Sequence, residues 1–293
     1  MNRKSLSLCL GIALLACLPL SAQTTYSFKE VNFTGDTFTQ LLGINNSGIV
    51  AGYHGASINK GFTYNDKTGA FTLENYPGSA QTQVIGINNL GRTVGFYIDS
   101  KNITHGFSDN KGVFSTVDQP GTPFNQLLGQ NDVSQAAGYY STAVDGSAPD
   151  HAYIFDEQGK VFATFTLPNS TGAQATGVNN AGTVCGFNLD AKGNSHGWLL
   201  VQGQYLILNY PGSASTMALG LNNVNQVVGT YNDKSGGTHG FVYNSSTKKW
   251  QQIDDPSGFG TTIVNGINDK GLLVGFWGTS PLNTGFVATP SAE

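Results

Sequence analysis

Four histidines of this chain stand at one position of a repeated pattern, and imidazole is well suited to bind metal ions or exchange protons near neutral pH. Each follows a polar segment and comes two residues before an aromatic side chain. A metal site built on one of them needs a carboxylate close by, and Asp150, directly before His151, is the nearest in sequence, with Asp145, Asp190 and Asp233 as companions in the polar segments. The four histidines are His105, His151, His196 and His239.

Aromatic side chains beside the same polar segments indicate a second chemistry. Tyr97, Tyr140 and Trp277 stand where the segments begin, and the segments carry few charges. Polar, uncharged loops that bear aromatic rings suit sugars or polar protein surfaces. We therefore predict a binding site formed by the four histidines together with Asp150, Tyr140 and Trp277.

A set of asparagines forms a third group of candidates. Each is expected at the end of an innermost strand, where the amide can bond the backbone of the following turn. The alternative is a ring of amides that holds an ion or a water chain, although tight cation sites use carboxylates. The set is Asn45, Asn88, Asn131, Asn179, Asn222 and Asn268.

Motifs of catalysis do not occur in the sequence. It has no Gly-x-Ser-x-Gly, His-Glu-x-x-His, phosphate-loop or EF-hand pattern. We therefore assign no catalytic residue and expect no cofactor, and the sequence leaves open whether a metal ion binds. A hydrolase or lyase acting on an extracellular polymer is the alternative to a binding module.

The candidate residues are placed by a sequence repeat. Six segments begin with Gly, one further residue, Asn and then Asn or Asp, at positions 43, 86, 129, 177, 220 and 266. The last unit is incomplete, and residues 26–42 align with the missing half. A repeat cut in this way leaves two open sheet edges unless the chain closes into a ring. The sequence thus predicts an all-β, six-bladed β-propeller whose last blade is closed by the N-terminal strand.

Each unit contains four short segments with strand character, which we expect to form four antiparallel strands per blade. In the second unit they cover residues 82–88, 92–98, 105–109 and 113–118. Such units bury their faces only against their neighbours. The glycines at the repeat starts are predicted to relieve crowding at the axis, and glycines in the second strand, such as Gly95, to repeat this device. One aromatic per third strand, such as Phe107, is predicted to fill the space between blades.

The geometry of a ring of blades limits how the four histidines can act together. Equivalent positions in neighbouring blades are too far apart to share one zinc ion, whose ligand bonds are about 2 Å long. The alternative to a shared pocket is that each imidazole satisfies its own loop through a backbone hydrogen bond. The segments before the histidines, with the crossovers between units, fall on one face of the ring, and this face varies from unit to unit. Variable loops on a rigid scaffold are where binding usually resides.

The combined repeat resembles the HAF-repeat family of predicted extracellular bacterial proteins. The motifs that carry the resemblance are Tyr-Pro-Gly at 76–78, Gly-Ile-Asn-Asn-x-Gly at 86–91, Val-Gly-Phe-Tyr at 94–97 and His-Gly-Phe at 105–107. The cycle covers nearly the whole chain after residue 22, with Lys60 and Thr284 in place of histidine in two units. The resemblance implies an exported, propeller-like protein and carries over no activity.

The N-terminal segment has the layout of a secretory signal. Basic Arg3 and Lys4 precede an apolar run over residues 6–20 and a small-residue exit at Ser21-Ala22. We predict a signal peptide over residues 1–22 and one propeller domain over residues 23–293, without a transmembrane segment, in the periplasm or outside the cell. The alternative is a lipoprotein anchored through Cys17. Cys185 is expected to be a small buried side chain.

Composition limits the partners. Only 11% of the residues are charged and the net charge is −4, whereas about 25% charged residues is usual. Without basic clusters, nucleic acid is excluded as a partner. The function predicted from the sequence is an exported binding or interaction module for an extracellular polysaccharide or protein, with carbohydrate or protein at the cell surface as partner.

Overall fold

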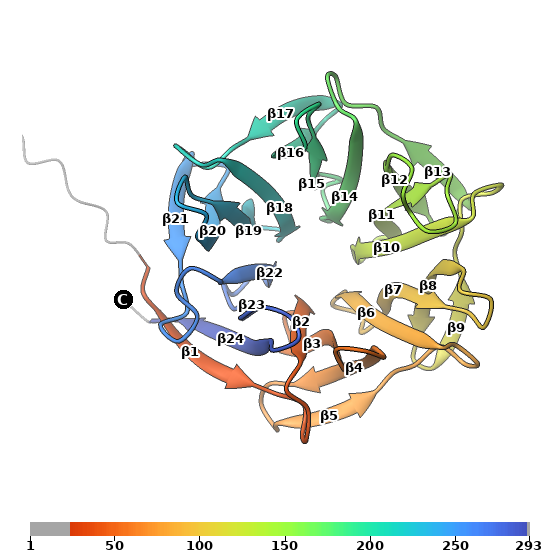
Figure 1. Ribbon diagram of the computed structural model, residues 1–293, viewed down its shortest axis with the longest axis horizontal. Helices are drawn as coiled ribbons and strands as arrows, with labels where there is room; N and C mark the ends of the chain where they lie inside the picture. The colour runs from red at the N-terminus through yellow and green to blue at the C-terminus, as the bar shows by residue number, and fades with distance from the viewer. Residues whose placement is uncertain (1–23, 292–293) are drawn as a thin grey trace, which may run out of the picture.

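The computed structural model describes residues 24–291, in which every regular element is a β-strand. The predicted signal segment, residues 1–22 with Cys9 and Cys17, lies outside the described residues. The strands are arranged around a central axis, and the first and last strands lie side by side (Figure 1). This arrangement is an all-β propeller, as the sequence predicts.

Four of the sheets contain four strands each. One contains β2 (Thr39–Ile44), β3 (Ile49–His54), β4 (Lys60–Asn65) and β5 (Ala70–Leu73). The next contains β14 (Gly172–Val178), β15 (Val184–Leu189), β16 (Ser195–Val201) and β17 (Gln204–Leu208). A third contains β18 (Ser215–Leu221), β19 (Gln226–Asn232), β20 (Thr238–Asn244) and β21 (Lys249–Ile253). The fourth contains β1 (Tyr26–Val31), β24 (Thr284–Pro290), β23 (Leu273–Trp277) and β22 (Ile263–Ile267).

An eight-stranded sheet completes the ring. Its first half is β6 (Gln81–Ile87), β7 (Thr93–Ile98), β8 (Thr104–Asn110) and β9 (Val113–Thr116). The second half is β10 (Phe124–Gln130), β11 (Gln135–Ser141), β12 (His151–Asp156) and β13 (Val161–Thr164). The halves are joined by a single parallel pair, Thr104 with Phe124. The predicted count of six blades therefore requires that this sheet be divided at that pair. We call each four-stranded antiparallel set a blade and name it by its strands.

Strand β1 completes the blade that contains the C-terminal strands. It pairs antiparallel with β24, with Tyr26 opposite Pro290 and Val31 opposite Gly285. This is the pairing that the sequence predicts. Val31 is buried and packs in one cluster with Leu41 of the following blade. The N-terminal strand thus joins two neighbouring blades as well as the two ends of the chain.

Glycines of the innermost strands let the blades meet at the axis. A Cβ built on Gly86 would lie 2.9 Å from the Cα of Gly129, and one on Gly266 would lie 3.3 Å from the Cα of Gly43. These distances are too short for an ordinary side chain, so the prediction for the first-strand glycines is confirmed. A bulge in the pairing with the second strand precedes the glycine in every blade.

Glycines of the second strands are crowded by two neighbours in their own blade. The atom closest to a built Cβ is a backbone carbonyl oxygen of the first strand, 2.1 Å away at Gly186 and 1.9 Å away at Gly229. A Cβ on Gly186 would lie 2.4 Å from the ring of Trp198, and one on Gly229 would lie 2.8 Å from the ring of Phe241. These aromatic side chains belong to the third strand of the same blade, so a ring adds to the backbone crowding that the sequence predicts. The glycine therefore makes room for the large side chain that fills the blade. All six third-strand aromatics are fully buried: Phe62, Phe107, Tyr153, Trp198, Phe241 and Phe286.

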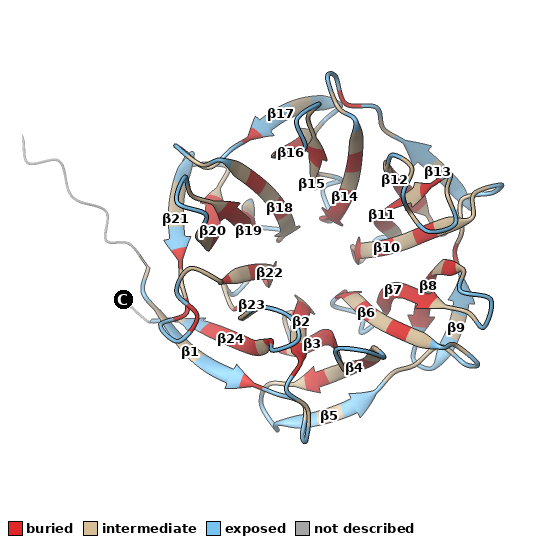
Figure 2. Ribbon diagram, viewed as in Figure 1, coloured by how far each residue is buried: buried red, intermediate tan, exposed pale blue. Residues whose placement is uncertain are grey.

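Burial decreases from the axis outward. The inner three strands of each blade carry the buried side chains, whereas the outermost strands are largely exposed (Figure 2). Cys185 on β15 is fully buried, and this burial raises the pKa of its thiol to about 12. The sequence prediction of a small buried side chain at this position is confirmed.

The ring has two faces of different character. The turn face carries the tight turns between first and second strands and between third and fourth strands. The loop face carries the loops between second and third strands and the crossovers from one blade to the next. This division follows from the antiparallel order within each blade.

Candidate functional site

Three of the four histidines on the loop face are held by carboxylates of their own blade. His105 Nδ1 lies 2.6 Å from Asp118 Oδ2, and His196 Nε2 lies 3.2 Å from Asp190 Oδ2. His239 contacts two aspartates. Each imidazole therefore satisfies its own loop, through a side chain rather than through the backbone. The structure does not bring the four rings into one pocket.

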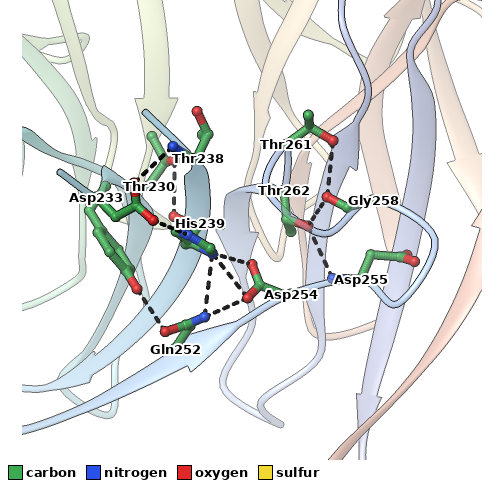
Figure 3. A network of polar contacts seen from close by, with 12 residues as sticks. Thr230, Asp233, Thr238, His239, Gln252, Asp254, Asp255, Gly258, Thr261 and Thr262 are labelled. Atoms are coloured by element: carbon green, nitrogen blue, oxygen red, sulfur yellow. Dashed lines mark hydrogen bonds and ion pairs between the residues drawn. The ribbon is translucent and has the colours of Figure 1, made fainter. Parts of the chain in front are cut away.

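His239 is the most enclosed of these histidines, with 6% of its side chain exposed. Its Nδ1 lies 3.0 Å from Asp254 Oδ1 and its Nε2 lies 3.3 Å from Asp233 Oδ2 (Figure 3). Gln252 Nε2 donates to Asp254 Oδ2 at 2.6 Å, and Tyr231 donates to Gln252 Oε1 at 2.8 Å. The imidazole is thus held between two carboxylates in a connected polar network.

A loop aspartate precedes each of the four histidines by six residues, with Asp145 before His151. Asp99, Asp190 and Asp233 each accept two backbone N–H groups of their own loop, which shapes the turn. The pKa of Asp233 is lowered, first by the backbone hydrogen bond from Gly237 and then by the side-chain hydrogen bond from His239. The pKa of Asp190 is also lowered, mainly by the side chain and backbone of Asn194.

Sequence reasoning missed three of these partners. Asp99, Asp118 and Asp254 were not among the candidates, although two of them contact a predicted histidine at 3.0 Å or less. The repeated spacing Asp-x-x-x-x-x-His was a signal for Asp99. Asp118 and Asp254 lie opposite the histidine on the outermost side of the blade, which only strand register reveals. Burial raises the pKa of Asp118, and the hydrogen bond from His105 opposes this effect.

The predicted pair of Asp150 and His151 is arranged differently. Asp150 Oδ2 accepts a hydrogen bond from Gln174 Nε2 of the next blade at 2.7 Å. His151 instead stacks on Tyr140, with ring centroids 4.8 Å apart and planes at 20°. Burial raises the pKa of Asp150. Adjacent positions on a strand end thus direct these two side chains to different blades.

Trp277 and an unpredicted aromatic lie near the His239 network. The crossover from β21 to β22 packs on Trp277, since a Cβ on Gly258 would lie 2.2 Å from the Trp277 Cβ. The next residue, Phe259, is 72% exposed, and its ring centroid lies 5.5 Å from that of His239. An exposed ring is therefore fixed beside a histidine and its two carboxylates.

The predicted asparagine ring lies at the turn face. In each of its members the side-chain oxygen accepts two backbone N–H groups of the following turn, and Nδ2 donates to the backbone carbonyl of the corresponding asparagine in the next blade. The last bond, from Asn268 to Asn45 O, is 3.0 Å long and closes the circle. The turn bonding was expected from the sequence, whereas the blade-to-blade bonds were not.

A second closed ring follows one residue later. Each backbone N–H donates to the side-chain Oδ1 of the corresponding residue in the next blade. Two of the six positions are aspartates, and each Oδ2 accepts from the amides on both sides. Six asparagines would leave these amide donors without acceptors, so the two carboxylates complete the ring. Its members are Asn46, Asn89, Asp132, Asn180, Asn223 and Asp269.

Residues 24–291 contain neither a cluster of metal-binding side chains nor a membrane-spanning helix. Within residues 24–291, His, Cys, Asp and Glu do not gather in groups of three or more that could hold a metal ion. Over the same residues, no helix is long and apolar enough to cross a membrane.

Solved structures of β-propellers resemble this chain. The lectin of Aleuria aurantia in complex with Fucα1-6GlcNAc superposes with a TM-score of 0.53 at 11% identity, over 88% of this chain and 96% of the lectin. The lectin SapL1 with α-methyl fucoside gives a TM-score of 0.54 at 9% identity, over 82% of this chain and 88% of that one. A protein assigned as TolB from Agrobacterium tumefaciens gives 0.63 at 8% identity, over 93% and 100%.

No protein-family model and no curated protein sequence matches the chain. The resemblance to HAF-repeat proteins therefore stays a prediction. At these identities the structural likenesses establish the fold alone. Together with the strand arrangement, they define the chain as a β-propeller protein.

Proposed function

We propose that this protein is an exported six-bladed β-propeller whose loop face binds an extracellular polysaccharide. The observation that carries the proposal is the exposed Phe259 ring beside His239, which is held by Asp233 and Asp254. The face of an aromatic ring packs against the C–H groups of a sugar, and neighbouring carboxylates and imidazoles accept or donate hydrogen bonds to its hydroxyls. The arrangement offers both kinds of contact in one place.

The blade count in this proposal rests on the single pair Thr104–Phe124 that joins β6–β9 to β10–β13. Dividing the eight-stranded sheet there leaves equal four-stranded units. A second structure of the Aleuria aurantia lectin is described as a six-bladed β-propeller with a fucose recognition mode. Export and the HAF-repeat assignment rest on the sequence of the N-terminal segment and on the repeat motifs.

Two solved lectins with this fold carry fucose-containing ligands in their descriptions. At about a tenth sequence identity they support a glycan ligand only as a class of molecule. The choice of the loop face rests on this chain's own side chains, because that face carries the residues that vary between blades. Extracellular protein surfaces, the other partner class predicted from the sequence, remain an outcome of the test.

A glycan array followed by titration calorimetry of the purified protein tests the proposal. Phe259→Ala is expected to weaken binding of the selected glycan about tenfold, since an aromatic contact contributes about 0.5–1.5 kcal/mol. Trp277→Ala should also weaken binding. Ile207→Ala is the matched control, because Ile207 is 65% exposed on the outer strand β17, away from the loop face.

The proposal is wrong if no glycan binds, or if the selected glycan binds equally well to Phe259→Ala and Trp277→Ala. Loss of binding in a folded Asn45 or Asn179 variant, with the loop-face variants unaffected, would move the site to the axial ring. Circular dichroism of each variant establishes that the ring is intact before affinities are compared.

A further inference from the structure

Neighbouring blades pack through three corresponding positions. One side chain comes from the end of the fourth strand of a blade, and two come from a cross-strand pair on the second and third strands of the next blade. In five of the contacts between blades all three side chains are apolar and belong to one core cluster. The sets are Val31, Val50, Tyr64; Val117, Ala136, Phe155; Phe165, Val184, Leu200; Leu208, Val227, Tyr243; and Ile253, Leu273, Ala288.

The contact between β2–β5 and β6–β9 departs from this pattern at all three positions. Glu74 follows β5, and Thr93 pairs with Asp109 across β7 and β8. The Thr93 hydroxyl donates a hydrogen bond to Glu74 Oε1. The five other contacts demonstrate that apolar side chains fit these positions, so the fold does not require two carboxyls here. Burying a carboxyl without a partner is costly.

A cavity lies at this contact. It measures about 470 Å³ and is lined by Glu74, Thr93, Asp109, Lys111, Thr63 and Phe114, among others. In the preceding blade the corresponding ring, Phe71, packs on Tyr64 with centroids 4.7 Å apart. Asp109 occupies the position of Tyr64, and the shorter side chain leaves space beside Phe114. Lys111 belongs to a turn of the turn face, so the cavity is separate from the loop-face site.

The cavity wall carries two carboxyl groups and one lysine. Asp109 is 6% exposed, and within residues 24–291 its Oδ1 has no hydrogen-bond donor. Burial raises the pKa of Asp109 and raises that of Glu74 to about 7. Lys111 is the third titratable group of the wall. A ligand that brings a positive charge and hydrogen-bond donors would satisfy both carboxyls.

The size and lining of the cavity favour an organic ammonium group over a bare metal ion. A bare metal ion needs six or more oxygen ligands at about 2.0–2.6 Å, and the cavity is far larger and offers two carboxyls. Ile49, Ile87 and Phe114 supply the apolar part of the lining. An ammonium group has three donors on a compact charge, and an attached carbon chain can cover this apolar lining.

We propose that the cavity between β2–β5 and β6–β9 binds a small molecule with a protonated primary amine on a short carbon chain. The ammonium group donates to the carboxyl groups of Asp109 and Glu74, and the carbon chain lies against Ile49, Ile87 and Phe114. Because the site lies on the turn face, it does not depend on glycan binding at the loop face.

Titration calorimetry of the purified protein with butylammonium tests this proposal, with methylammonium, hexylammonium and 1,4-diaminobutane completing the series and 1-butanol as the neutral control. We expect butylammonium to bind at least tenfold more tightly than 1-butanol at pH 8. At pH 6 binding should release a proton, since the ammonium group favours the ionised form of Glu74. Calorimetry in two buffers of different ionisation enthalpy measures that proton.

Variants that copy residues of the other blades supply the controls. Asp109→Asn keeps the shape of the side chain and is expected to weaken butylammonium binding at least tenfold. Glu74→Val introduces the valine that stands at positions 31 and 117. It should weaken binding to the same extent while raising the melting temperature. Asp145→Asn removes an exposed loop carboxylate and should change neither. Absence of binding across the amine series, equal binding of 1-butanol, or binding of Ca²⁺ in place of the amines would overturn the proposal.

Discussion

On the turn face, polar side chains bond from each blade to the next in two closed rings, whereas three histidines of the loop face bond carboxylates of their own blade. Side-chain bonds between blades also occur on the loop face, such as Gln174 to Asp150, but they do not form a ring. The Nδ2 of Asn179 donates to the Asn222 backbone of the following blade, and the same bond recurs around the ring. His196, on the loop face of the same blade, bonds Asp190 of its own loop. Both faces are rich in polar residues, but only on the turn face do the bonds between neighbouring blades recur at every blade and close into rings.

This difference explains why one face repeats and the other varies. A residue in a closed ring must match two neighbouring blades, so a change at one position leaves donors or acceptors unpaired in the next. A loop that satisfies its own polar groups imposes no such condition on the adjacent loop. The loop face is therefore free to carry Phe259 beside His239, where the other blades, over the residues that the structure describes, have no such exposed ring.

The largest effect is expected from opening the ring. Deleting residues 24–34 removes β1, exposes the edge of β24 and removes Val31, whose burial alone contributes about 1.5–3 kcal/mol. We expect loss of cooperative melting and aggregation, measured by calorimetry and light scattering. Lys29→Ala, on the same strand and exposed, should change stability by less than about 1 kcal/mol. Cooperative melting of the deletion variant at the wild-type temperature would show that blade-to-blade contacts do not depend on closure.

Glu74 is expected to make one blade-to-blade contact depend on pH. Burial raises its pKa from 4.5 to about 7, so the folded chain retains a proton that the unfolded chain has released. Its contribution is fully present below about pH 4.5 and is lost as the pH rises through about 7, by about 3 kcal/mol. Urea unfolding at pH 5 and pH 8 measures this change. The profile should flatten in Glu74→Val, and parallel profiles would contradict the argument.

Asn179→Ala and His196→Ala compare the two faces within one blade. Asn179 Oδ1 accepts from the N–H groups of Ala181 and Thr183, which would lose this partner. We expect a loss of about 1–3 kcal/mol for Asn179→Ala and of about 0.5 kcal/mol or less for His196→Ala. Chemical unfolding of both variants provides the values. Equal losses would remove the distinction between the faces.

Asp132→Asn is expected to have a smaller effect than Asn179→Ala. Asp132 Oδ2 accepts from the amides of Asn89 and Asn180, and an asparagine cannot accept both bonds while its Oδ1 serves the Asn89 backbone. The expected loss is about 1 kcal/mol. Asp156→Asn, outside the second ring, serves as the control. An unchanged melting temperature for Asp132→Asn would mean that the two aspartates are not needed to complete the ring.

Much of the fold could be predicted because repeats compare a sequence with itself. The spacing of the Gly-x-Asn motif located the first strands, and the complementary end fragments predicted the pairing of β1 with β24. Site residues were harder. His239 was named from its position in the repeat. Asp254 follows the neighbouring strand β21, and Phe259 lies in the crossover from β21 to β22, whose sequence differs from the crossovers of the other units.

Glu74 is an example of a residue for which the sequence determines one property and only the structure determines another. Its alignment with Val31 could be read from the repeats alone, because corresponding positions share one local environment along the chain. Its contact with Thr93 and its place beside Asp109 were decided by the packing of one blade on the next, which brings together residues that local periodicity does not relate. Sequence by itself determined the repeating unit, since short strands and tight turns depend on neighbouring residues. Only the tertiary structure decided which side chains of adjacent units share a cavity, a ring or a hydrogen bond.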